Sequence, residues 1–256
     1  MSKLSLVIPT FNEEKNIRIP LDSAYDIVDE VLIIDGGSSD KTVEIAKSYG
    51  SKIKVLSVDN PINFLQNKER GIKYANFEWI LQLDADEALT KELKNEIKEL
   101  ISDNNEATKS TAGYYIPRKN WFLGQFLMKG GVYPDAVLRL YKKQGAHFAL
   151  RDVHENVIVE GATSHTKNAI EHYADPDFER YLTRWNRYTT FESIRLIKSK
   201  AKLCFFCYFF GKPLGTFFNI YFRHKGFMDG FPGFIWALFS SIRWWAIYIK
   251  ARTAKT

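Results

Sequence analysis

Residues 79–87 read WILQLDADE, and this short stretch decides the fold. Its first five residues form a nearly continuous apolar run, which is typical of a strand buried on both faces. The residues that follow place three acids, Asp84, Asp86 and Glu87, within four positions. Crowded carboxylates repel one another, so we expect a cation at the end of this strand to offset the repulsion.

Similar apolar runs alternate with helical segments over the first two-thirds of the chain. Residues 4–8, 31–34 and 53–56 are short β-rich runs, and later strands are expected at 114–117 and 137–141. The expected helices cover residues 41–49, 67–75 and 90–100. Continuous apolar strands separated by helices predict a parallel sheet covered on both faces. We therefore expect an α/β fold with a Rossmann-like, mixed but mostly parallel sheet flanked by helices.

Three polar segments follow three of the expected strands. They are residues 9–12, residues 35–37 and residues 84–86. In parallel sheets of this kind, ligands bind in the crevice outside the carboxyl ends of the strands. The three segments are therefore expected to converge on one ligand-binding edge.

The Asp84-x-Asp86 spacing suits a hard divalent cation, because carboxylate oxygens are preferred ligands of Mg²⁺ and Mn²⁺. Such a cation would neutralise the diphosphate of a bound nucleotide. The alternative is a purely structural acidic helix start, since the helix dipole favours acids in a first turn. Placement after a buried strand, beside two other polar strand ends, favours the metal site.

Asp35 ends another apolar strand and is followed by Gly36 and Gly37. The two glycines permit close approach of the backbone to a ligand, and Asp35 could accept a hydrogen bond from a base or a ribose. The structural alternative is a plain strand–turn–helix with Ser39 or Asp40 as the N-cap. No phosphate-binding loop of the G-x-x-x-x-G-K-[ST] or G-x-G-x-x-G type is present in the sequence.

The charge and the aromatic residues gather in the last quarter of the chain. Residues 198–256 hold ten Lys and Arg and one acid, a charge of about +9, whereas the whole chain carries +6. Of the 38 aromatic residues, 17 lie between Leu203 and Ile249. A basic, aromatic-rich segment suits an anionic membrane surface. Nucleic acid is the alternative partner for a basic segment.

The chain is expected to divide into a catalytic domain, residues 1–200, and a helical extension, residues 201–256. Asp175-Pro176 resembles an N-cap followed by a first helical residue and predicts a helix to about residue 200. Within the extension, Phe231–Ile249 is apolar nearly all round but is broken by Arg243, which favours an interfacial helix over a membrane span. The alternative is a helical pair packed on the catalytic domain, with its Lys and Arg solvated.

The two cysteines, Cys204 and Cys207, have a C-x-x-C spacing. Without a second pair or a neighbouring His, this spacing does not favour a zinc site. We expect two small apolar positions in a reducing compartment rather than a disulfide framework.

Three separated motifs, IPTFNEEKNI (8–17), IIDGGSSDKTVEIA (33–46) and WILQLDADE (79–87), together resemble the family 2 glycosyltransferases of the GT-A fold. The resemblance covers at least residues 3–160. Further segments are similar to the lipopolysaccharide core β-1,4-glucosyltransferase branch: VLRLYKK (137–143), DVHENV (152–157), WNRYT (185–189) and KGFMDGFPGF (225–234). The chain departs from the pattern at Glu69, where relatives often have Asn.

The resemblance implies a set of donor-binding residues. Asp86 would be the metal ligand at the diphosphate, and Asp84 would contact ribose or metal. Asp35 would bind the base, and Lys68 and Arg139 would approach the phosphates; for Arg139, a pairing with a surface acid is the alternative. The loop around the base and ribose would contain Pro9, Thr10, Asn12 and Glu14.

The resemblance also implies an inverting reaction, which needs a general base to deprotonate the acceptor hydroxyl. Glu155 is the first candidate, followed by Asp152 and His154. In a strand, residues 152 and 154 would lie on one face and residue 155 on the other. A turn that starts at Asn156 would therefore have to direct the Glu155 side chain toward the site. The structural alternative is that all three residues only order the acceptor loop.

The function that the resemblance implies is transfer of a hexose, namely glucose, from UDP-glucose to a glycolipid such as the lipopolysaccharide core, with Mg²⁺ or Mn²⁺. The partners would be the nucleotide sugar, the glycolipid and an anionic membrane surface at the cytoplasmic face of the inner membrane, with no nucleic acid. A phosphatase of the haloacid-dehalogenase type also has D-x-D after a strand, but there a Thr follows, whereas Glu87-Ala88 follows here. A non-enzymatic protein that binds sugar or nucleic acid at the membrane is the remaining alternative.

Overall fold

The computed structural model describes residues 2–59, 65–102, 110–149, 156–199 and 202–254. It divides into two compact units. The sheet unit comprises Met1–Arg118 and Asp135–His172, and the helical unit comprises Lys119–Pro134 and Tyr173–Thr256. The units therefore part after Arg118 and His172 rather than at residue 200, because helix α6 (Phe178–Lys198) packs on the C-terminal helix and not within the sheet unit.

The sheet unit contains a mixed sheet with four parallel strands at one end. The parallel strands are β1 (Leu4–Thr10), β2 (Glu30–Asp35), β3 (Ile53–Ser57) and β4 (Trp79–Gln82), in the spatial order β3-β2-β1-β4. The sheet continues with β8 (Asp135–Lys142), β6 (Thr111–Phe122), β10 (Ile170–His172) and β5 (Glu87–Leu89). Strand β9 (Ala162–His165) pairs with β6 in parallel, whereas β8 is antiparallel to both β4 and β6. The predicted mixed, mostly parallel sheet is confirmed.

Both faces of this sheet are buried, which explains the continuous apolar runs in the sequence. Along β1, Leu6 and Ile8 belong to one hydrophobic cluster and the intervening Val7 to the other. Helices α1 (Arg18–Ala24) and α4 (Lys91–Leu100) contribute to the first cluster, and α3 (Leu65–Tyr74) to the second. Helix α2 (Thr42–Lys47) contributes Ala46 to the first cluster. Because side chains alternate between two covered faces, most positions of the central strands are apolar, with Ser5 and Arg139 as buried polar exceptions.

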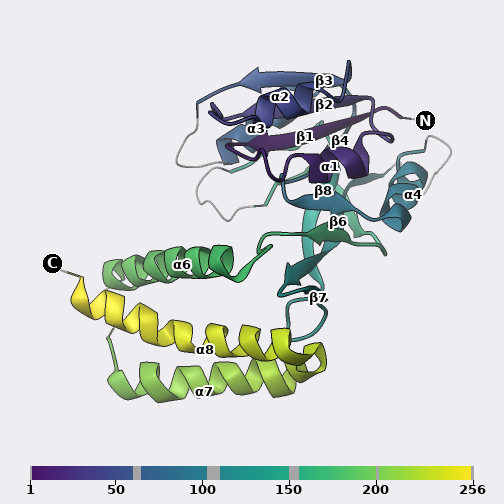
Figure 1. Ribbon diagram of the computed structural model, residues 1–256. Helices are drawn as coiled ribbons and strands as arrows, with labels where there is room; N and C mark the ends of the chain where they lie inside the picture. Colours follow the sequence, from purple (N-terminus) through teal and green to yellow (C-terminus); the bar gives the residue numbers. More distant parts are fainter. Residues whose placement is uncertain (1, 60–64, 103–109, 150–155, 200–201, 255–256) are drawn as a thin grey trace. The chain divides into compact units, whose positions relative to one another are not determined.

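The helical unit is built from three long helical segments and a short hairpin, and Figure 1 shows α8 (Gly230–Thr253) between α6 and α7. The segment around α7 (Lys212–Phe217) continues at both ends as π-helical turns, η1 (Cys207–Gly211) and η2 (Phe218–Arg223). A 3₁₀ turn, η3 (Gly226–Asp229), precedes α8, and β7 (Gln125–Leu127) pairs with the end of β6. The core of the unit is aromatic, with Phe122, Tyr181, Trp236 and Phe239 in contact.

The central position of α8 explains the composition of residues 231–249. Gly233, Ala237 and Ser241 are buried along the helix, which packs on α6 on one side and on α7 on the other. A helix with two packed sides needs apolar residues over most of its circumference. None of the helices in the described part of the chain combines the length and hydrophobicity of a membrane span.

The KGFMDGFPG segment forms a close turn between η3 and α8. A Cβ at Gly233 would lie 2.0 Å from the carbonyl oxygen of Gly226, so only glycine fits there. Asp229, which is buried, accepts hydrogen bonds from the backbone N–H groups of Met128 and Lys129 at 3.1 and 2.7 Å. The single acid of the basic segment therefore holds the hairpin of its own unit.

Two local predictions were wrong. The N-cap of α6 is Asp177, whose side chain accepts from the Arg180 N–H at 2.7 Å; Asp175 instead pairs with Arg184. Cys204 and Cys207 form a disulfide, with Cα atoms 5.3 Å apart. Asp177 caps the helix because it lies directly before the first turn and its backbone is extended.

Candidate active site

The carboxyl ends of the parallel strands carry the polar side chains that the sequence singled out. Thr10 ends β1 and pairs in register with Asp35, which ends β2. Asp84 lies two residues beyond the end of β4, on the other side of β1. The parallel order of these strands thus places all three residues at the same edge of the sheet.

Asp35 organises the turn that follows β2. Its carboxylate accepts from the backbone N–H groups of Gly37 and Ser38 at 3.2 and 3.0 Å. The hydroxyls of Ser38 and Thr10 donate to its other oxygen at 2.5 and 3.3 Å. Gly37 has φ +82°, a conformation that favours glycine, so this turn depends on its sequence. Asp35 is therefore an ordered, buried acceptor at the ligand edge.

The loops after β1 and β2 are bound to each other by side chains. Asn12, at φ 56°, accepts from the Ser39 N–H at 2.8 Å and donates its own N–H to Ser38 Oγ at 2.9 Å. Glu14 donates its N–H to Asp40 at 3.0 Å and accepts from the Lys41 N–H at 3.2 Å. Asn12 and Glu14 thus fix the geometry of the loop that the resemblance places around the nucleotide.

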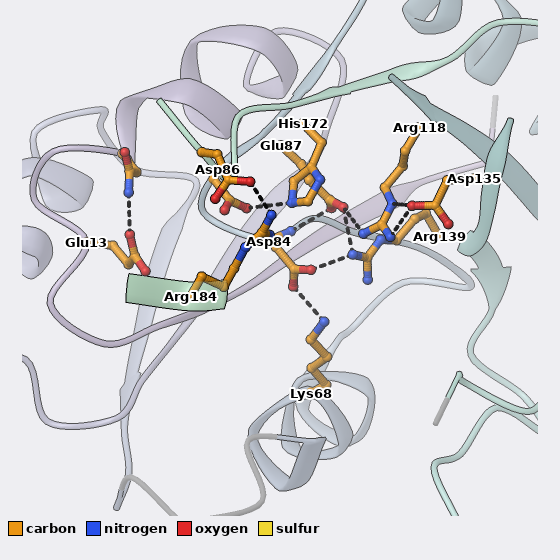
Figure 2. A network of polar contacts seen from close by, with 12 residues as sticks. Glu13, Lys68, Asp84, Asp86, Glu87, Arg118, Asp135, Arg139, His172 and Arg184 are labelled. Carbon is orange, nitrogen blue, oxygen red and sulfur yellow. Dashed lines mark hydrogen bonds and ion pairs between the residues drawn. The ribbon is translucent and has the colours of Figure 1, made fainter. Parts of the chain in front are cut away.

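Asp84 lies between two cations, as Figure 2 shows. Its Oδ1 is 2.6 Å from the Lys68 Nζ, and its Oδ2 is 2.5 Å from the Arg139 guanidinium. Lys68 comes from α3 and Arg139 from β8, so the three residues are far apart in sequence. The structure therefore brings together three of the predicted donor-binding residues.

Glu87 forms buried ion pairs with two arginines of this group. It is fully buried, and its Oε1 is 2.7 Å from Arg139 and 3.3 Å from Arg118, while its Oε2 accepts from the Asp84 N–H at 2.9 Å. Arg118 also forms two hydrogen bonds to Asp135, at 3.1 and 2.6 Å. The result is a chain of alternating charges that fixes both the side chain of Arg139 and the backbone at Asp84.

Asp86 points to a different partner. Its Oδ1 lies 3.6 Å from the Nε2 of His172, which sits on β10 opposite Glu87. Figure 2 shows this pair beside the network of Asp84 and Glu87. The two aspartates of the D-x-D motif therefore differ in environment: Asp84 faces buried cations, and Asp86 faces an imidazole.

Neighbouring charges in the site stabilise the ionised forms of Asp84, Glu87 and Arg139. Burial opposes ionisation of Asp84, but the charges of Arg139 and Lys68 outweigh it and hold the pKa of Asp84 well below its ordinary value. In the same way the pKa of Glu87 is lowered, mainly by Arg139 against the effect of burial. The pKa of Arg139 is raised by both acids, and burial lowers the pKa of Lys68 although Asp84 opposes this. Asp84, Glu87 and Arg139 are thus held in their charged forms, whereas burial opposes the charge of Lys68.

Sequence reasoning did not identify Arg118, Asp135 and His172, which complete the network. Arg118 and Asp135 face each other in the register of β6 and β8, a pairing that no short motif reveals.

Glu69, the departure from the family pattern, accepts from the Phe148 N–H at 2.8 Å and so holds the backbone after β8. Pro9 lies in β1 beyond its pairing with β4. The base candidates Asp152, His154 and Glu155 lie outside the described residues.

The sheet order, with charged side chains at the carboxyl ends of its parallel strands, defines the GT-A class of glycosyltransferase folds. Residues 5–227 match the family described as Glycosyl transferase family 2. The chain belongs to this family, and the predicted resemblance is confirmed.

Curated relatives extend over nearly the whole chain. An uncharacterized glycosyltransferase of Rickettsia felis is 30% identical over 246 residues, covering 92% of this chain and 84% of the relative. The lipopolysaccharide core biosynthesis glycosyltransferase LpsC of Rhizobium meliloti is 25% identical over 249 residues, covering 93% and 88%. Both likenesses include the helical unit.

Among solved structures, the chain is similar to the mannosyltransferase PcManGT from Pyrobaculum calidifontis in complex with GDP-Man and Mn²⁺. The TM-score is 0.56 at 12% identity, covering 100% of this chain and 88% of that one. At this identity the likeness shows the fold alone.

Proposed function

We propose that this enzyme transfers glucose, with inversion, from UDP-glucose to a glycolipid acceptor of the lipopolysaccharide core type. The observation that carries the proposal is the pair of buried cations, Lys68 and Arg139, held at the carboxyl edge of the sheet by Asp84. The similarity to LpsC, whose name states lipopolysaccharide core biosynthesis, supports the acceptor class.

Lys68 and Arg139 are suited to a leaving diphosphate. Transfer of a sugar leaves negative charge on the nucleotide diphosphate, and preorganised cations stabilise such developing charge without having to reorient. Arg139 is fixed by Asp84 and Glu87, and its buried Nε has no hydrogen-bond partner among the described residues. Guanidinium groups form strong, charge-assisted hydrogen bonds to phosphate oxygens, which suits Arg139 to the diphosphate.

The acids of this edge also fit a divalent cation. Mg²⁺ is commonly held by one or two carboxylates together with phosphate oxygens of the substrate. Asp86 and Asp84 supply two carboxylates, with His172 beside Asp86. Within the described ranges no three His, Cys, Asp or Glu side chains are grouped around one point, so diphosphate oxygens would have to complete the coordination. A bound Mg²⁺ or Mn²⁺ would supply Lewis-acid neutralisation of the diphosphate.

Glu155 is the proposed general base, with Asp152 and His154 as alternatives, and Pro9, Thr10, Asn12, Glu14 and Asp35 are proposed to surround the nucleoside. Replacing Glu155 by Gln keeps the shape of the side chain and removes its basicity. We expect at least a roughly hundredfold loss of kcat, the usual size of a general-base contribution. Transfer by the Glu155→Gln enzyme at the wild-type rate would refute this assignment.

A donor screen tests the proposal as a whole. Release of UDP or GDP from a set of nucleotide sugars is measured with a glycolipid acceptor, with and without EDTA. We expect UDP-glucose to be turned over fastest and EDTA to abolish turnover. The Asp86→Asn variant should lose about a hundredfold or more in kcat/KM, whereas Glu78→Gln, which changes an exposed acid of the same unit, should keep full activity.

Other acceptors, such as a capsule intermediate, a lipid carrier or a protein, are tested by exchanging the acceptor in the same assay. A non-enzymatic sugar-binding protein would bind the nucleotide sugar and release no UDP. The proposed location is peripheral, on the cytoplasmic face of the inner membrane, where a nucleotide sugar and a growing glycolipid would both be available.

A further inference from the structure

The helical segment around α7 exposes one line of large apolar side chains, which we call the apolar stripe. Its members are Phe206 (72% exposed), Phe210 (54%), Leu214 (69%), Phe218 (64%) and Phe222 (50%). Neighbouring members touch at both ends of the line: the rings of Phe206 and Phe210 are 6.2 Å apart, and those of Phe218 and Phe222 are 5.2 Å apart. Apolar side chains exposed in a continuous line on a soluble surface mark a site of interaction.

The stripe is straight because of the π-helical turns. Its members recur every four residues, whereas an α-helix has about 3.6 residues per turn, so in a regular α-helix the line would wind around the axis. A π-turn closes i→i+5 hydrogen bonds and holds more residues per turn. With η1 and η2 on either side of α7, the mean comes close to four residues per turn, which aligns the five side chains.

The opposite side of the same helix already has its packing partner. Tyr208 and Pro213 are buried, and Thr216 accepts a hydrogen bond from the indole N–H of Trp244 on α8 at 2.9 Å. Lys212 places its Nζ 3.5 Å from the ring centre of Tyr208 and 4.5 Å from that of Trp244. The fold of the helical unit is therefore complete without the stripe.

The charge around the stripe has one sign. Residues 202–254 contain seven Lys and Arg and a single acid, Asp229, which is buried and bound to backbone N–H groups. Lys202 before the stripe and Arg223 and Lys225 after it are exposed. The loop and helix start that follow add further exposed apolar residues, Phe227, Met228 and Phe231. Apolar side chains flanked by exposed cations are complementary to the surface of an anionic bilayer.

We propose that the apolar stripe inserts into the interface of an anionic lipid bilayer, with Lys202, Arg223 and Lys225 on the lipid headgroups. The membrane-binding element is thus the α7 segment, with the exposed residues that lead into α8. Helix α8 itself packs on α6 and α7 and buries Gly233, Ala237, Ser241 and Ile247. A second copy of the chain is the less suitable occupant, because pairing two stripes would bring like charges together. The inference deepens the proposed function by naming its membrane partner, and it rests on that function only for the glycolipid acceptor.

Vesicle flotation of the full chain tests the proposal with probes that contain neither donor nor acceptor. Vesicles of phosphatidylcholine with 30% phosphatidylglycerol, about a third anionic lipid, are compared with pure phosphatidylcholine vesicles. We expect binding to the anionic vesicles that weakens as salt is added. Because two apolar side chains would lose their burial in the lipid, the double variant Phe206→Ser/Leu214→Ser should bind at least about tenfold more weakly.

Two further variants separate the possible results. Tyr74→Ser removes an aromatic side chain that is 53% exposed on the sheet unit, and it should bind like the wild type. Arg223→Gln/Lys225→Gln should weaken binding to anionic vesicles about tenfold or more, at roughly 1 kcal/mol per charge, and change binding to neutral vesicles little. UDP release from UDP-glucose without vesicles should be the same in all variants, so a failed donor assay and a failed flotation assay are distinguishable. The proposal is overturned if the stripe variant floats like the wild type, or if it alters only the oligomeric state.

Discussion

The two edges of the parallel sheet each hold a buried carboxylate, but they satisfy it in different ways. At the amino edge, Glu30 accepts from Ser5 Oγ at 2.6 Å and from the backbone and side-chain nitrogens of Asn76 at 2.6 and 2.7 Å. Among the described residues it pairs with one cation, Lys54, at 3.0 Å, whose side chain is 56% exposed. At the carboxyl edge, Glu87 is bound by Arg139 and Arg118, whose guanidinium groups lie in or near the protein interior.

The difference separates a structural network from a functional one. Neutral donors satisfy Glu30 at little cost, and the result stabilises the edge where β1, β2 and the segment before β4 meet. Burying several formal charges is expensive, and well-packed apolar residues would often be as stable or more so. We propose that the carboxyl edge holds its charges to bind an anionic substrate rather than for stability.

The largest effect is expected from Glu87→Gln. This change leaves Arg139 and Arg118 without their shared buried anion, and breaking a buried ion pair from one side costs about 3–5 kcal/mol. Urea unfolding of the purified variant measures the loss. A loss below about 1 kcal/mol would mean that Glu87 contributes no more to the free energy of unfolding than an exposed ion pair does.

Lys68→Met should damage substrate binding more than stability. Lys68 is 8% exposed and pairs with Asp84, which keeps Arg139 after the change. Loss of one charged hydrogen-bond donor to the diphosphate is worth about 1.5–3 kcal/mol, so the KM for the donor should rise about tenfold or more. Steady-state UDP release measures this, with Lys54→Met at the other edge as the matched control. An unchanged KM would exclude Lys68 from donor binding.

Glu30→Gln should have the opposite profile. The amide cannot accept all the hydrogen bonds that Glu30 accepts and loses its attraction for Lys54, so we expect a loss of about 2 kcal/mol in the free energy of unfolding. The KM and kcat of the variant should equal those of the wild type, since the amino edge is remote from the ligand edge along every strand. A change in KM without loss of stability would contradict the division between the two edges.

The stability contributed by Glu30 should depend on pH. Burial alone would raise the pKa of Glu30, but hydrogen bonds from Ser5 and Asn76 outweigh burial and lower it. A carboxyl group whose pKa falls on folding contributes its full stability above the ordinary glutamate value of about 4.3, and the contribution is lost as the pH falls through the lowered value. The difference between wild type and Glu30→Gln in urea unfolding should therefore shrink below about pH 4. A constant difference from pH 7 to pH 3 would contradict this.

The smallest effect is expected from Lys54→Met alone. More than half of this side chain is exposed, and pairs of this kind contribute about 0–1 kcal/mol. We expect a change below about 0.5 kcal/mol by urea unfolding and a weak dependence on salt. A larger loss would show that the charge of Lys54, and not the neutral donors, holds Glu30.

The fold class and the family could be predicted from local patterns in the amino-acid sequence. The apolar runs that became β1, β2 and β4 reported burial on both faces, whereas β3 is partly exposed. The polar residues after β1, β2 and β4 marked the ligand edge. These are local signals, because the period of apolar residues and the residues that end a strand are visible within about ten positions. Lys68 and Arg139 were identified only through the family resemblance, whereas the spacing of Asp84 and Asp86 after a buried strand marked Asp84 without it.

Only the tertiary structure decided which charges meet. Glu87 finds Arg118 and Arg139 across 31 and 52 residues, and Asp86 finds His172 across 86, distances over which no periodicity carries information. Which apolar side chains of the helical unit are exposed, those of the apolar stripe, was likewise not readable from the sequence. Residues 231–249 are as apolar as a membrane-binding helix would be, but α8 packs on both α6 and α7, and π-helical turns direct five other side chains outward. Burial is a property of the assembled fold, so a sequence can show that a segment is apolar but not which neighbour covers it.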